Sequence, residues 1–286
     1  MKKQLLSCLK FIIFLLVFHP IIAGAGIRVS PGAFCIQNVE IGVDLDLGID
    51  LTITNDSDSQ KSFIVESIKP SLVKKNWLKG YSEIPNPKWL YFEKNYITVP
   101  PYSSGKTRIH IKIPNDRKYY NQHWIVYARV SLDQQNEMFN VELKPSYLIE
   151  TMPNSDHMAE TTGVIAVTPS IIKMDASMGN QKSFIISNND NEIHEYRIYQ
   201  YIPLRGEQKK QSIIASSGCV LSDDNFFLKF KEEKFKLFPK ETRKFFVGIN
   251  PDKNAASLDK NREAILMIES ENGVSTFVRV EEERRG

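Results

Sequence analysis

The chain has 286 residues, 42% of them hydrophobic, with 37 Lys and Arg against 34 Asp and Glu. This hydrophobic fraction can build packed cores, which excludes a disordered chain. Three of the basic residues, Lys2, Lys3 and Lys10, lie in the first 25 positions, so the rest of the chain has balanced charges. Electrostatic binding to nucleic acid needs a basic excess, so we expect no nucleic-acid partner.

Residues 1–25 have the composition of a secretory signal peptide. A basic start is followed by the apolar run Phe11–Phe18 and by the small residues Ala23-Gly24-Ala25, which predicts cleavage after Ala25. The alternative is an uncleaved membrane anchor, but the apolar run is shorter than the roughly 18–20 residues that span a bilayer. We therefore expect a bacterial protein that is periplasmic, secreted or on the cell surface, with no membrane span in the mature chain.

Export changes the interpretation of the cysteines. Cys8 would leave with the signal, whereas Cys35 and Cys219 would remain in a compartment where disulfides persist. Two alternatives stay open: a disulfide between the two halves of the chain, or two separate thiols packed as small apolar side chains.

The chain repeats its sequence pattern at a period near 138 residues. The same motifs recur in the same order, with offsets of 133 to 140 residues, which indicates a duplicated domain. The matching segments are 29–31 with 167–169, 51–56 with 184–189, 89–92 with 227–230, Pro101 with Pro239, 107–108 with 242–243, 113–114 with 250–251, and 125–126 with 265–266.

Both halves show the alternation of apolar and polar residues that is typical of β-strands. Examples are residues 109–113, 124–130, 228–231 and 245–249, and turn-forming clusters separate such runs. Asn272-Gly273 is a candidate for a two-residue hairpin turn. The predicted fold is all-β, with two tandem immunoglobulin-like β-sandwich domains after the signal peptide.

The expected domain boundaries follow from this pattern. The first domain comprises residues 26–150, a polar linker 151–162, and the second domain 163–286. Each half contains a longer irregular stretch, 70–88 in the first and 203–225 in the second. Long loops on a rigid sandwich often bind ligands, although a plain surface excursion is the alternative.

We find no motif for catalysis, a cofactor or a metal. Glycine-rich phosphate loops, nucleophile elbows, H-E-x-x-H and C-x-x-C are all missing from the sequence. His110 lies in an alternating run and is interpreted as a strand-surface residue. Asp44, Asp46 and Asp50 suggest a calcium site, but their alternation with apolar residues favours an exposed strand face. We predict a protein that is not an enzyme.

A basic stretch lies in the second half of the chain. Its cations alternate with apolar residues that would point inward, which is typical of a sheet edge kept soluble by lysines. The alternative is a surface for an anionic envelope polymer. The cations are Lys229, Lys231, Lys234, Lys236, Lys240, Arg243 and Lys244.

The motif order resembles that of bacterial immunoglobulin-like domains of exported proteins. Val-x-Pro is followed by an apolar strand ending in Asn, then by W/F-L-x-F, a proline-containing turn and apolar-x-Pro. Residues 27–150 look most like the N-terminal domain of periplasmic pilus-assembly chaperones. The resemblance implies a protein that lends a strand to a pilus subunit and holds the subunit's C-terminal carboxylate with basic residues.

The strand implied by this resemblance is 139–144. Phe139, Val141 and Leu143 would lie on one face, and Lys144 stands about where the family has its strand lysine. The family's first-strand arginine would align near Ala33, whereas Arg28 is close in sequence but out of register. An apolar strand edge can bind a partner by strand addition, although an ordinary half-buried strand is the alternative.

Two functions are therefore expected from different classes. The first is a pilus- or fimbria-type assembly chaperone whose partners are pilin-like subunits bound through Phe139, Val141, Leu143 and Lys144. The second is an immunoglobulin-like module that binds glycan or cell-envelope polymer.

Overall fold

The computed structural model describes residues 26–73, 78–133, 141–156, 164–175, 181–202, 213–222, 228–250 and 261–283. Strands dominate these residues, and the helical segments among them are three single turns of 3₁₀ helix, η1 (Pro70–Leu72), η2 (Pro87–Trp89) and η3 (Arg117–Tyr119). No helix in the described parts is both long and apolar enough to cross a membrane. The predicted signal segment, 1–25, lies outside the described residues and stays a prediction.

The first sandwich consists of two sheets. One has the order β1 (Ile27–Ser30), β3 (Asp44–Asn55), β8 (Ser103–Lys112), β6 (Leu90–Phe92). The other has the order β2 (Ala33–Val39), β11 (Ser146–Thr151), β9 (His123–Leu132), β4 (Lys61–Ile68), β7 (Tyr96–Val99), and β9 also pairs with β5 (Ser82–Glu83) and β10 (Glu142–Leu143). Leu51, Phe63, Ile109 and Trp124, contributed by both sheets, are nearly inaccessible and form the core between them.

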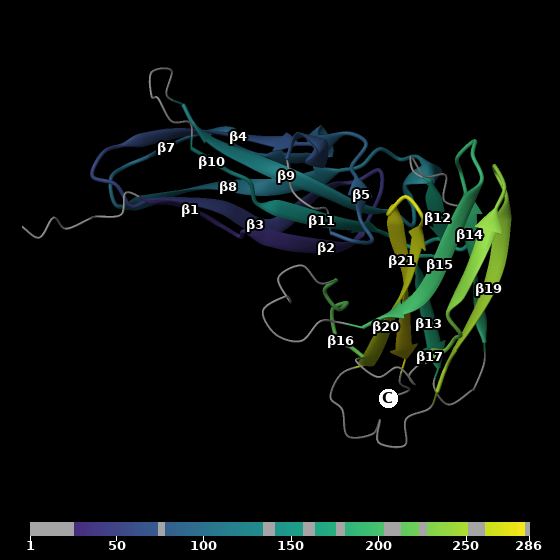
Figure 1. The fold of residues 1–286 in the computed structure, drawn as a ribbon. Helices are drawn as coiled ribbons and strands as arrows, with labels where there is room; N and C mark the ends of the chain where they lie inside the picture. The colour runs from purple at the N-terminus through teal and green to yellow at the C-terminus, as the bar shows by residue number, and fades with distance from the viewer. Residues whose placement is uncertain are drawn as a thin grey trace, which may run out of the picture.

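The second sandwich repeats this arrangement. One sheet has the order β12 (Ile165–Thr168), β14 (Lys182–Asn188), β19 (Thr242–Ile249), β17 (Leu228–Lys229). The other has the order β13 (Ile171–Asp175), β21 (Ser275–Glu283), β20 (Asn261–Ser270), β15 (His194–Tyr201), β18 (Glu233–Leu237), with β16 (Cys219–Leu221) paired to β20. Figure 1 shows the two sandwiches set across each other, meeting near β5, β12 and β21.

The prediction of two tandem immunoglobulin-like sandwiches is confirmed. In each, the first strand ends at a proline and the next strand joins the opposite sheet in parallel with the last strand, β2 with β11 and β13 with β21. Asn55 and Asn188, matched by the repeat, are both fully buried. Asn55 Nδ2 donates to the carbonyls of residues 59, 99 and 100, and Asn188 Nδ2 to those of 192, 237 and 238. The sequence repeat therefore preserves a hydrogen-bonding role, because a buried turn carbonyl needs a donor.

One prediction about a turn is wrong. Asn272-Gly273 is not a two-residue hairpin, since the last paired residues of β20 and β21 are Glu269 and Ser275. Ser270 N donates to Val274 O, and Gly273, with φ of 78°, donates to Ser270 O. Glu269 and Ser275, the residues at the base of this turn, contact the first sandwich, as described below.

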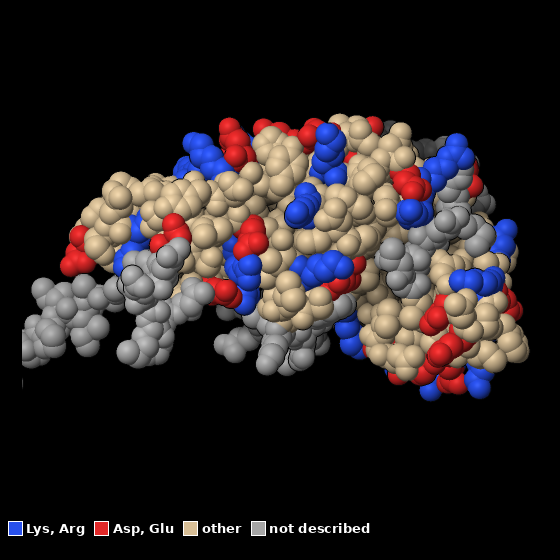
Figure 2. Space-filling model, turned by 90° about the horizontal axis from the view of Figure 1, so that it is seen from above, with Lys and Arg blue, Asp and Glu red and all other residues tan. Residues whose placement is uncertain are grey.

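The acidic residues singled out in the sequence lie on β3 and are paired with basic residues. Asp44 contacts Lys112, while Asp46 and Asp50 both contact Arg108 from the neighbouring strand. His110 stacks on the ring of Tyr91 at the sheet surface. In the face seen in Figure 2, acidic and basic side chains are interspersed over both sandwiches, so no single sign of charge dominates this face.

The basic stretch of the second half follows an edge strand. Lys234 and Lys236 lie on β18, the edge of its sheet, and they alternate with Phe235 and Leu237, which are buried. Lys236 is 3.7 Å from Glu195, and Arg243 pairs with Glu233. These positions fit the interpretation of a soluble edge.

Candidate functional site

The outer edge of β10 is open. β10 pairs with β9 through Glu142↔Ser131 and Leu143↔Val130, and β2 runs along the other side only from Ser146 onward. Within the described residues, no strand pairs with the outer edge of residues 141–145. This short length of main chain can therefore accept a strand from another molecule.

The apolar side chains of this edge differ in burial. Leu143 shares a rung with Val130 and Val65, both buried, and it packs against the core of the first sandwich. Val141 is 42% exposed, and Phe139 lies outside the described residues. The sheet's outward face nearby carries two exposed apolar side chains, Ile64 and Tyr96.

The structure does not bring together the basic residues needed to hold a free carboxylate. The Lys144 ammonium, just after β10, lies 2.6 Å from the Glu142 carboxylate, and this hydrogen bond lowers the pKa of Glu142. Arg28 lies in β1, in the opposite sheet, where it forms a two-pronged ion pair with Asp56. Ala33 faces Ser146 at the start of β2. Lys144 therefore already has a carboxylate partner, and Arg28 is remote in the fold.

The two sandwiches are joined by an apolar cluster that the sequence did not reveal. It combines Ile125, Tyr127 and Leu148 of the first sandwich with Ile265, Met267 and Phe277 of the second, all buried. The two long irregular stretches also contribute. Val73 and Tyr81 come from the first stretch and Ile213 from the second.

The first long stretch, 70–88, is therefore a contact between sandwiches rather than a free loop in its described part. Gly80 N donates to Ser275 Oγ over 2.8 Å, and Lys79 pairs with Glu269 at 2.8 Å. The Tyr81 ring meets the Phe277 ring edge-on at 5.4 Å. These contacts come from residues that are almost 200 positions apart.

A buried ion network crosses the same junction. Arg279 of β21 donates Nε and Nη2 to the Glu150 carboxylate of β11 at 2.7 and 2.6 Å, and it donates Nη1 to Glu263 of β20. All three side chains are 0–3% exposed. At Glu150, burial raises the pKa, but the attraction of Arg279 lowers it, and the net shift is downward. At Glu263 the effect of burial is larger than that of Arg279, so the pKa is raised. One cation thus serves two buried carboxylates.

Burial disfavours the charged forms of two groups beside this network, the Cys35 thiol and the His123 ring. Burial raises the pKa of the Cys35 thiol to about 12 and lowers that of His123 to about 4. The Tyr81 hydroxyl donates to Glu150 at 2.6 Å, and the His123 ring stacks on Phe277. Both Cys35 and Cys219 are free thiols, so of the two alternatives the structure contains separate cysteines. Cys35, Tyr81 and His123 pack and hydrogen-bond within the junction.

The side-chain amide of Asn121 also connects the two sandwiches, through hydrogen bonds to main-chain groups. Asn121, with φ of 60°, accepts from the N–H groups of Asn154 and Ser170 through Oδ1 and donates to Asn154 O. Asn154 lies in the predicted linker and Ser170 in the second sandwich. One buried amide therefore fixes the start of the linker to both sandwiches.

His194 forms a separate polar cluster in the second sandwich. Its ring nitrogens lie 2.9 Å from Asp190 and 3.0 Å from Glu271, its ring meets Tyr196 edge-on, and Lys240 acts on Asp190 from the adjoining turn. The hydrogen bond to Asp190, with that to Glu271, raises the pKa of His194 above its ordinary 6.5, against the effect of burial.

We expect this cluster to make stability depend on pH. Because the folded pKa is raised, the stabilisation by His194 is complete below pH 6.5 and is lost as the pH rises through the folded pKa. Urea midpoints measured from pH 5.5 to pH 9 should therefore converge for wild type and His194→Gln as the pH rises. A constant difference between the two proteins would contradict this assignment.

Comparison with known proteins gives similar folds at low identity. No protein-family model matches the chain, and no curated protein matches it. Similar solved structures include a protein of unknown function from Porphyromonas gingivalis W83, with 10% identity, a TM-score of 0.35, and coverage of 90% of this chain and 99% of that chain. The class 5 fimbriae chaperone CfaA has 11% identity, a TM-score of 0.33, and coverage of 91% and 100%. The E. coli chaperone DraB has 10% identity, a TM-score of 0.32, and coverage of 91% and 98%.

Proposed function

We propose that this chain is an exported, non-enzymatic binding protein that engages partner subunits by β-strand addition at the open edge of β10. The carrying observation is the sheet order, in which residues 141–145 have a neighbour on one side only within the described chain. Added main-chain hydrogen bonds supply affinity in this mode, and alternate side chains supply selectivity. The partner class is a pilin-like subunit of an exported assembly, on the sequence resemblance stated above.

The roles of the four predicted residues follow from this proposal. Val141 and Phe139 offer apolar side chains to the partner, while Leu143 anchors the strand to the core of the first sandwich. Lys144 exchanges its contact with Glu142 for a contact with the partner. In the same proposal, residues 1–25 direct export to the periplasm, 26–150 form the strand-presenting domain, 151–162 the linker, and 163–286 the second domain.

The envelope-polymer alternative has less support. The basic residues of the second sandwich that would attract a polyanion are partly neutralised, because Lys236 faces Glu195 and Arg243 pairs with Glu233. These two pairs reduce the positive charge that the stretch offers to an anionic polymer.

A substitution at the exposed position of the edge tests the proposal. Val141→Asp is expected to reduce co-purification of partner subunits from the exporting cell by at least about tenfold, since a charge enters an apolar contact and 1.4 kcal/mol corresponds to a factor of ten. Val43→Asp is the matched control, because Val43 is 37% exposed against 42% for Val141 and lies away from β10.

Photo-crosslinking distinguishes this mode from a nonspecific contact. A photoreactive residue at 141 should crosslink to an extended segment of an exported subunit, and the same residue at 43 should not. Equal crosslinking at both positions, or retention of the chain on purified cell wall without any protein partner, would contradict strand addition.

A further inference from the structure

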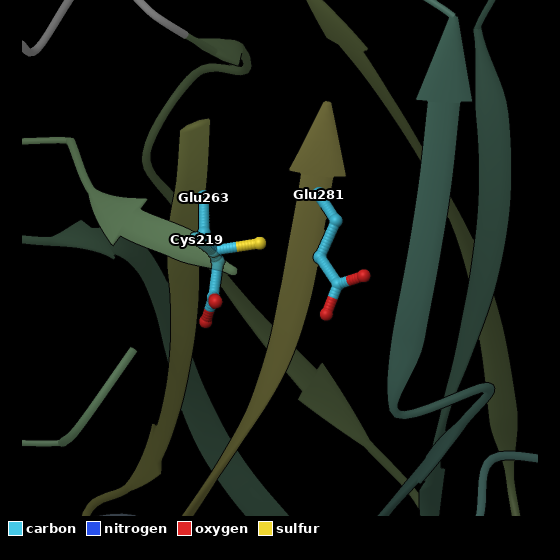
Figure 3. Close-up of side chains that lie close together, drawn as sticks. All are labelled: Cys219, Glu263 and Glu281. Atoms are coloured by element: carbon cyan, nitrogen blue, oxygen red, sulfur yellow. The ribbon is translucent and has the colours of Figure 1, made fainter. Parts of the chain in front are cut away.

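Three side chains that can bind a metal converge at one end of β20 and β21. Glu263 and Glu281 lie directly opposite each other in this antiparallel pair, and Cys219 comes from β16, which runs parallel to β20. The Cys219 Sγ and one carboxylate oxygen of each glutamate all lie within 4.8 Å of one another. Figure 3 shows the sulfur located between the two carboxylates.

The local charge favours a cation there. Like charges directly opposite in a sheet destabilise it, and Glu263 and Glu281 are such a pair. Arg279 is shared between Glu263 and Glu150. Lys173 lies 3.9 Å from Glu281, but it is 57% exposed and equally close to Glu283. The cations that contact this pair therefore also serve other carboxylates.

The surroundings fix the orientation of the buried ligand. Glu263 is fully buried, and its carboxylate accepts from Ser216 N at 2.7 Å and from Arg279 Nη1. A carboxylate has about four lone-pair positions, so these two bonds leave room for a metal ion. Outer-shell hydrogen bonds of this kind orient metal ligands in proteins. Cys219 is half-buried, so the site is not sealed within the core of the second sandwich.

We propose that Cys219, Glu263 and Glu281 form a binding site for a divalent transition-metal ion of the zinc type. Zinc accepts sulfur and oxygen ligands in a tetrahedral arrangement, and three protein ligands leave the fourth position for water. Calcium and magnesium prefer oxygen ligands, so the thiolate selects against them. The thiol proton is displaced to solvent when the sulfur–metal bond forms. The bound ion joins β16, which carries Cys219, to β20 and β21.

The test uses the whole chain with Zn²⁺ and Co²⁺ as probes, under a metal-free reductant. We expect Zn²⁺ at about 100 times its Kd to raise Tm by roughly 5–10 °C, and Co²⁺ to produce a sulfur-to-metal charge-transfer band. Cys219→Ser should abolish the band and weaken Zn²⁺ binding by about 100-fold or more. Glu281→Gln should weaken Zn²⁺ binding while it leaves the fold intact, because the amide has the size and shape of the carboxylate and the Glu281 side chain is 12% exposed.

Cys35→Ser is the matched control, since Cys35 is the other free thiol of the described chain and lies near a single carboxylate, Glu150. It should retain both the band and the zinc affinity. Zinc binding that survives Cys219→Ser unchanged, a Ca²⁺ effect equal to that of Zn²⁺, or no metal-dependent change in wild type would each overturn the proposal.

Discussion

Replacing Arg279 with methionine is expected to lower the free energy of unfolding by about 3–5 kcal/mol, because it leaves two buried carboxylates without their cation. Glu150 and Glu263 are 3% and 0% exposed, and both depend on the same guanidinium. The loss is measured by urea denaturation of the whole chain at neutral pH. Because the pairs span β11 and β21, we also expect the two sandwiches to unfold in separate steps in this variant.

Two comparisons isolate the effect of burial. Arg28→Met removes an exposed ion pair with Asp56 and should leave Tm nearly unchanged. Glu150→Gln combined with Arg279→Met should recover part of the lost stability, since one of the stranded charges is then neutral. If Arg279→Met lowers the free energy of unfolding no more than Arg28→Met does, the buried ion network does not stabilise the contact between the sandwiches.

Much of the fold could be predicted from the sequence because it depends on local patterns, strand alternation and turn residues, that recur in both halves of the chain. Alternating residues identify strands, and the recurrence of Asn55 as Asn188 marks a turn whose carbonyls need a buried donor. The open edge of β10 was predicted as an alternating strand, but its exposure depends on where β2 begins, and register is a property of the folded sheet.

The junction escaped prediction because its residues are distant in sequence and belong to segments interpreted as loops. One signal was present. Residues 264–268 form an unbroken apolar run, and β21 carries Phe277 and Arg279 on one face and Val278 and Val280 on the other. A strand that is apolar on both faces is covered on both sides. In this chain one face of β20 and β21 packs in the core of the second sandwich. The other face packs against the first sandwich, where it contacts Tyr81 and Ile125.

Replacing Gly80 with alanine should lower the free energy of unfolding by about 3 kcal/mol. Gly80 has φ of 90°, which costs a residue with a Cβ about 1–2 kcal/mol. An added Cβ would also lie 2.5 Å from Phe277 Cδ1 and 3.0 Å from Cε1, and overpacking of this kind costs about 1–3 kcal/mol. The measurement is the urea midpoint of each variant in the whole chain.

Gly273→Ala separates these two contributions. Gly273 has φ of 78° and no atom within 4 Å of the added Cβ, so this variant carries only the backbone penalty. The difference in unfolding free energy between the two variants therefore measures the steric overlap between the added Cβ of residue 80 and Phe277. Phe277→Leu should relieve part of that difference when it is combined with Gly80→Ala, since contacting residues couple in a double-mutant cycle. Equal losses of unfolding free energy for Gly80→Ala and Gly273→Ala would show that Gly80 is not tightly packed against Phe277 of the second sandwich. The contact between the sandwiches would then depend on the other members of the apolar cluster and on the bonds made by Arg279 and Asn121.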